Sequence, residues 1–164
     1  MVRGFTRRFD PERPRDAAAE QQDAHLPPPT VPIPRAPSGS ALVLPGGRPH
    51  SLYHCRHDCD VLIADSHLTE LCAQDPRIHV AKIDTLRSCE DRVACPLCLP
   101  TETDYTKIKR CSVTTPTGPR EALLTLWRRA PDSTWHAVVM YTLNSRLTAH
   151  PHPATSLNPL PTRR

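Results

Sequence analysis

The chain has 164 residues, including 20 Pro, 5 Gly and 4% aromatic residues, so it carries few of the large side chains that fill a compact core. A chain of this length suits one domain, and we expect part of it to lie outside that domain. The formal net charge of +4 is uneven, with a slightly acidic middle segment and a basic C-terminal part, which indicates a mild basic tail and not a nucleic-acid-binding stripe. No apolar stretch approaches the roughly 18 residues of a membrane span.

Residues 1–49 are predicted to form a disordered tail rich in Pro and Arg. No apolar segment of an export signal follows Met1, which favours a cytoplasmic location. The stretch Leu26–Pro37 is dominated by Pro, which lacks an amide donor and favours extended backbone. We expect an extended linker here, with docking on an aromatic groove as the alternative.

The folded part is predicted over residues 50–145, as a small zinc-stapled α+β domain. Its first element is the apolar run Asp60–Ala64, which has the length of a strand. Asp65 and Ser66 then supply an N-cap for a short helix, which ends at Pro76. Further along, residues 77–84 show a mixed strand pattern and residues 85–93 favour a second short helix.

A β-hairpin is predicted after a strand over residues 103–115. Two apolar runs, 121–129 and 134–143, flank the sequence Ala130-Pro-Asp-Ser, whose Pro, Asp and Ser suit a type I turn. Trp127 and Trp135 then lie near the closing end of the hairpin. Residues 146–164 return to a Pro-rich composition and are predicted to form a second disordered tail.

The strongest motif is a set of two cysteine pairs, Cys55-x₃-Cys59 and Cys95-x₂-Cys98. Seven cysteines and no export signal favour metal binding over disulfides. Tetrahedral Zn²⁺ takes four thiolate or imidazole ligands, and a pair two to four residues apart lets one turn present both. We therefore predict a structural zinc ion held by all four cysteines. Through these residues the chain resembles zinc-ribbon and treble-clef zinc fingers.

Several alternatives to this ligand set remain open. The chain has Leu99 in place of the Gly that typically follows the second pair, and His54 and His57 border the first pair and could replace a cysteine. Cys89 and Cys111 are further candidates, although buried apolar thiols are the simpler interpretation of both, as of Cys72. Four cysteines can also hold an iron–sulfur cluster.

These features favour an interaction or regulatory module with a protein partner over an enzyme. A zinc enzyme needs an open coordination position, and only His54, His57 and Asp58 near the first pair offer support for one. The runner-up is a DNA- or RNA-binding accessory protein. Its basic candidates surround the second pair or lie at the hairpin tip: Arg87, Arg92, Lys107, Lys109, Arg110, Arg128 and Arg129.

Overall fold

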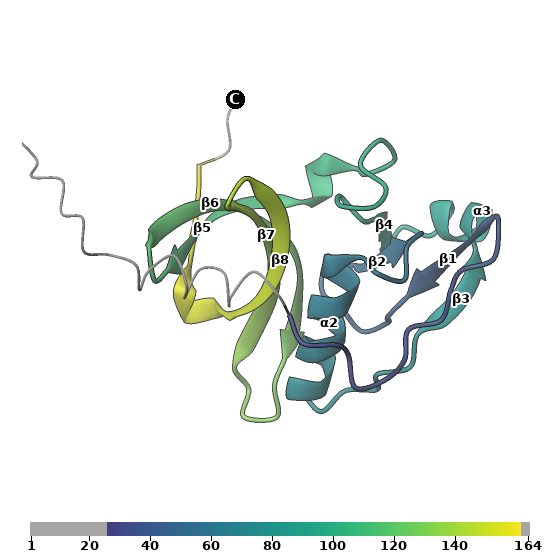
Figure 1. Ribbon diagram of the computed structural model, residues 1–164, viewed down its shortest axis with the longest axis horizontal. Coiled ribbons are helices and arrows are strands. Elements are labelled where there is room, and N and C mark those ends of the chain that lie inside the picture. Colours follow the sequence, from purple (N-terminus) through teal and green to yellow (C-terminus); the bar gives the residue numbers. More distant parts are fainter. Residues whose placement is uncertain (1–25, 162–164) are drawn as a thin grey trace, which may run out of the picture.

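The computed structural model describes residues 26–161, and the predicted tail residues 1–25 and 162–164 lie outside this part (Figure 1). Its elements are β1 (Ser40–Val43), β2 (Ser51–His54), α2 (Asp60–Leu71), β3 (His79–Lys82), α3 (Ile83–Arg87), β4 (Arg92–Ala94), η1 (Tyr105–Lys107), β5 (Lys109–Thr115), β6 (Gly118–Arg129), β7 (Trp135–Leu143), β8 (Arg146–Pro153), η2 (Ala154–Ser156) and β9 (Leu157–Pro159). Two sheets and few helices confirm the α+β class. Within the described residues, no helix is long and apolar enough to cross a membrane.

The first sheet has the strand order β3-β1-β2-β4. β1 runs antiparallel to both of its neighbours, whereas β2 and β4 are parallel and place Tyr53 opposite Ala94. Parallel neighbours end at the same edge of a sheet, so the chain leaves β2 and β4 at neighbouring points. The two cysteine pairs follow these two strand ends.

The second sheet is antiparallel, with the order β8-β7-β6-β5-β9, and it is strongly curved (Figure 1). β8 pairs with β7 at one edge and β9 pairs with β5 at the other, and only η2 separates β8 from β9. One segment therefore joins both edges of the curved sheet. An apolar cluster forms within this sheet from Cys111, Val113, Ala122, Leu124, Ala137, Val139, Tyr141 and Leu143.

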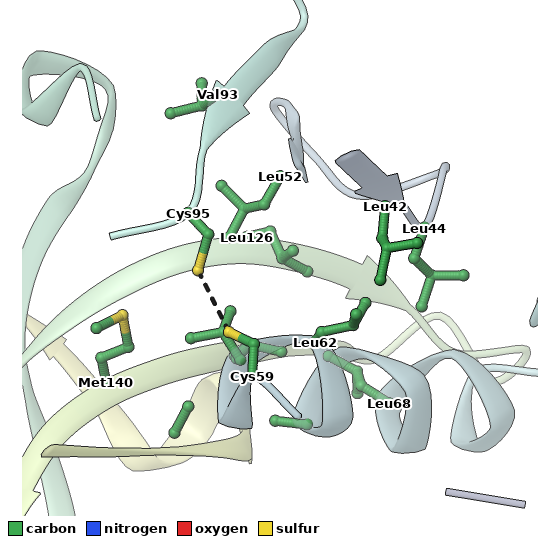
Figure 2. Packing of buried hydrophobic residues seen from close by; sticks show 14 of the residues in the cluster. Leu42, Leu44, Leu52, Cys59, Leu62, Leu68, Val93, Cys95, Leu126 and Met140 are labelled. Atoms are coloured by element: carbon green, nitrogen blue, oxygen red, sulfur yellow. Dashed lines mark hydrogen bonds between the residues drawn. The ribbon is translucent and has the colours of Figure 1, made fainter. Parts of the chain in front are cut away.

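Helix α2 lies between the two sheets (Figure 1). The main core gathers around it, with Leu42 and Leu52 from the first sheet and Leu126 and Met140 from the second (Figure 2). The buried residues of α2 are Val61, Leu62, Ala64, Asp65, Ser66, Leu68 and Thr69. The predicted strand over 60–64 is therefore wrong, because these residues form the first turns of a helix that is buried on most of its surface.

A buried ion pair connects α2 to the second sheet. The Arg128 side chain is 0% exposed, and its Nε and Nη2 atoms donate to the two carboxylate oxygens of Asp65 at 2.5 and 3.0 Å. Its remaining donors reach the Gln74 Oε1 atom and the carbonyl oxygens of Pro45 and Leu44. Arg128 therefore does not contribute to an exposed hairpin tip, as its sequence position suggested.

The predicted hairpin is present as β6 and β7, with Arg129 opposite Trp135. The amide of Ser133 donates to the carbonyl of Ala130 at 2.9 Å, which closes the predicted turn. Trp127 pairs with Ala137 two positions further into the ladder, so both tryptophans lie near the closing end. Local turn chemistry and apolar pattern agree here, and the prediction is confirmed.

The sheets extend beyond the predicted limits of 50 and 145, since β1 precedes residue 50 and β8 and β9 follow residue 145. The Pro-rich stretch Leu26–Pro37 forms no helix or strand, but it lies against α2. There the His67 Nε2 atom donates to the Pro27 carbonyl at 2.7 Å, and the Thr30 hydroxyl donates to Glu70 at 3.0 Å.

Candidate metal centre

Four potential metal ligands meet where β2, α2 and β4 come together. His54 is the last residue of β2, and Cys59 is the N-cap residue of α2. Cys95 directly follows β4, and its amide donates to the Tyr53 carbonyl at 3.0 Å, which continues the pairing of the parallel strands. With Cys98 they form a group in which one ligand atom from each residue lies within 4.8 Å of all the others.

The spacing of these atoms suits a tetrahedral ion. The Cys59 and Cys95 sulfurs face each other at 3.7 Å (Figure 2), and the Cys98 sulfur lies 3.9 Å from the His54 Nδ1 atom. Zinc–sulfur bonds of about 2.3 Å and zinc–nitrogen bonds of about 2.0–2.1 Å place neighbouring ligand atoms roughly 3.5–3.8 Å apart. Small side-chain adjustments would therefore bring all four onto one ion.

The group is buried and leaves one polar atom unsatisfied. His54, Cys59 and Cys95 are fully buried, whereas Cys98 is half-buried. Among the described residues, the His54 Nε2 atom has no hydrogen-bond partner. A buried polar group without a partner costs free energy, and nearly all such groups in folded proteins are satisfied. The unsatisfied atom is not the one that faces the group, because the ring presents its Nδ1 atom to the Cys98 sulfur.

The electrostatic surroundings favour a thiolate at Cys59. Hydrogen bonds from Cys95 and then from Cys98 lower the pKa of the Cys59 thiol to about 4. The first-turn amides of Leu62 and Val61 lower it further, although the Cys59 sulfur makes no regular capping bond to the helix. Burial raises the pKa of Cys95 well above its usual value. The hydrogen bonds from the two neighbouring cysteines and from the first turn of α2 thus stabilise the Cys59 thiolate, which is the form that binds a metal.

Cys55 lies outside this group, although the sequence predicts it as a ligand. Its side chain is exposed, its sulfur donates to the Cys98 carbonyl at 3.2 Å, and its amide donates to the Cys98 sulfur at 3.4 Å. Partial desolvation of the sulfur beside Cys98, and then the charge and hydrogen bonding of Cys98, raise the pKa of the Cys55 thiol to about 11. β2 ends at the buried His54, and Cys55 follows the strand in an exposed position.

The structure thus brings three predicted ligands, Cys59, Cys95 and Cys98, together with His54, which the sequence left open as a replacement. The remaining candidates lie elsewhere. Cys72 and Cys111 are buried in apolar clusters, and the Cys89 sulfur donates to the Thr85 carbonyl. His57 is half-exposed and Asp58 pairs with Arg56, so neither belongs to the group.

Comparison of the chain with known protein families, with curated proteins and with solved structures finds no match. Its function is therefore inferred from the geometry of its own residues.

Proposed function

We propose that this protein is a small, non-catalytic binding module whose fold is held together by one structural zinc ion. The ligands in this proposal are His54, Cys59, Cys95 and Cys98, with His54 in the place expected for Cys55. The observation that carries it is the group of four donor atoms within 4.8 Å of one another, three of them on fully buried residues.

The donor set supports zinc in a structural role. Three thiolates and one imidazole are a ligand set found in structural zinc sites, and soft sulfur donors select zinc or iron–sulfur clusters over magnesium or calcium. Four protein ligands also complete a tetrahedral shell, whereas catalytic zinc keeps one position for water. The finer expectation of a zinc-ribbon or treble-clef arrangement stays a prediction.

A bound ion would cross-link two strand ends of the first sheet to the N-terminus of α2. Zinc binding to structural sites supplies about 10–16 kcal/mol in small zinc-finger peptides, as much as the whole stability of a typical domain. Without the ion, two buried thiols, a half-buried thiol and a buried imidazole remain close together. We therefore expect the metal to contribute most of the net stability of the fold.

Native mass spectrometry and chelation test this proposal. We expect one zinc per chain in protein purified without added metal, and a melting temperature that falls by about 10 °C or more after chelation, since a loss of several kcal/mol produces a shift of that size. A brown protein with iron and sulfide would indicate an iron–sulfur cluster instead. A metal-free chain that melts at an unchanged temperature would contradict the proposal.

A structural zinc ion leaves the protein surface free to bind a partner, and the identity of that partner stays a prediction. From the sequence alone we expect a protein partner, with nucleic acid as the alternative. The charged and aromatic side chains on the surface of the folded chain distinguish between these two kinds of partner.

A further inference from the structure

The two tryptophans of the chain share one face with three cations that have no counterion. We call this the tryptophan–arginine face and define it by Arg48, Lys109, Trp127, Arg129 and Trp135. Trp127 and Trp135 line one pocket together with Arg48 and Lys109, and an adjoining pocket contains Arg48, Arg129 and Trp135. Arg48 and Trp135 belong to both pockets, so the two form a continuous surface.

Its geometry is fixed by backbone pairing. The Arg48 amide donates to the Trp127 carbonyl at 2.8 Å, and the Trp127 amide donates back to the Arg48 carbonyl at 2.7 Å. Arg129 and Trp135 are direct partners in the β6–β7 ladder. The aromatic and cationic side chains therefore start from one rigid backbone, and Trp135 is 41% exposed.

The cations of this face differ from most of the others that the sequence singled out, although among the described residues Lys107 also lacks a carboxylate partner and donates to the Glu90 carbonyl. Near the second cysteine pair, Arg87 pairs with Glu102 and Asp84, Arg92 pairs with Asp91, and Arg110 pairs with Glu121. By contrast, Arg48, Lys109 and Arg129 are exposed, and within residues 26–161 no carboxylate pairs with their side chains. Asp75 lines the pocket that contains Arg129, but its carboxylate forms an ion pair with Arg77 at 2.7 Å.

We propose that the tryptophan–arginine face binds single-stranded nucleic acid. Exposed cations without a carboxylate partner favour an anionic ligand, and the exposed Trp135 ring with the partly buried Trp127 ring provides flat surfaces on which bases stack. Phosphates bound by the cations and bases stacked on the indoles would use both components of the face. An acidic peptide would satisfy the cations but would leave the indole surfaces without a matching group. The proposal does not depend on zinc, since no candidate metal ligand belongs to the face.

Both tryptophans lie on this face, so intrinsic tryptophan fluorescence reports directly on its occupation. The probe is a single-stranded oligothymidylate of about ten nucleotides, titrated into the full chain, because single-strand binding sites span roughly 4–16 nucleotides. We expect saturable quenching. With three phosphate contacts, affinity should fall by about 20-fold between 50 and 200 mM salt.

Two matched pairs of variants place the binding site. Trp135→Ala should weaken binding by roughly 5- to 150-fold through lost stacking, whereas Tyr105→Ala, an exposed aromatic outside the face, should leave it unchanged. Arg129→Gln should lower the slope of log affinity against log salt by about 0.7, and Lys82→Gln on β3 should not. Circular dichroism verifies that each variant is folded.

Three results would overturn the proposal. The first is the absence of quenching at low salt. The second is unchanged affinity in both Trp135→Ala and Arg129→Gln. The third is equal competition by an acidic peptide of the same charge, which would assign the face to a protein partner instead.

Discussion

Arg128 and Asp65 carry the largest predicted single-residue effect away from the metal. Both side chains are buried, and the charge of each is neutralised only by its partner in this ion pair and by neighbouring hydrogen bonds. Asp65→Asn leaves the Arg128 guanidinium buried without its counterion, which typically costs about 3–5 kcal/mol. We therefore expect a large drop in the free energy of unfolding, measured by urea denaturation.

The Arg77–Asp75 pair is a matched control, since its bidentate geometry is similar but both side chains are exposed. Asp75→Asn should change the free energy of unfolding very little, because solvent and salt screen exposed pairs. Equal effects of the two substitutions would contradict a special role for the buried pair.

His50 predicts a dependence of stability on pH. Its Nε2 atom donates to the Thr125 carbonyl at 2.8 Å, and burial lowers the pKa of its ring below the usual value of 6.5. Below pH 6.5 the ring is protonated in the unfolded chain before it is protonated in the folded chain. The free energy of unfolding therefore decreases as the pH is lowered, by at most about 1.4 kcal/mol per pH unit from this group.

His50→Gln keeps a donor for the Thr125 carbonyl but cannot titrate. Urea denaturation of both proteins between pH 7 and 5 should show a smaller loss of stability in the variant. Identical pH profiles would show that His50 does not contribute.

At the scale of elements, the sequence predicted the parts whose signals are local. The β6–β7 hairpin was predictable, because the Pro-Asp-Ser turn lies between two apolar runs. Helix α2 was predicted only in its second half, with a cap at Asp65 and Ser66, because burial on most of its surface weakens the amphipathic period that identifies a helix. Residues 60–64 then cannot be distinguished from a short buried strand.

Strand β8 was also missed, for a different reason. Pro151 and Pro153 give the sequence the composition of a tail. Both lie in an edge strand at positions two apart, so their missing amide donors fall on the same side of the strand, away from the ladder with β7. Proline is compatible with a strand only under this tertiary condition.

The turn between β7 and β8 offers a test of the second sheet. Asn144 and Ser145 connect the strands with φ angles of 50° and 61°, as a type I′ turn requires. Ser145→Gly creates the preferred Asn-Gly sequence and should stabilise the fold by about 0.5–1 kcal/mol. Ser112→Gly within β5 is the matched control and should destabilise by a similar amount. A destabilising Ser145→Gly would contradict the positive φ angle at this position.

At the scale of the whole molecule, both sheets contribute to the core around α2, and the candidate metal centre lies at the N-terminal end of this helix. Cysteine spacing predicted three members of the donor group, because a short x₂ turn or a helix start constrains its geometry locally. The fourth member depends on which of the neighbours His54 and Cys55 faces inward. The end of β2 decides that, since the strand stops at the buried His54 and leaves Cys55 exposed, and cysteine spacing alone cannot show where the strand ends.

The zinc content of two matched variants tests the central claim most directly. Cys55→Ser and Cys98→Ser make the same chemical change, one outside the donor group and one within it. By native mass spectrometry we expect Cys55→Ser to retain one zinc per chain and Cys98→Ser to lose it. Loss of zinc from Cys55→Ser as complete as from Cys98→Ser would contradict the proposed ligand set and restore the four-cysteine site.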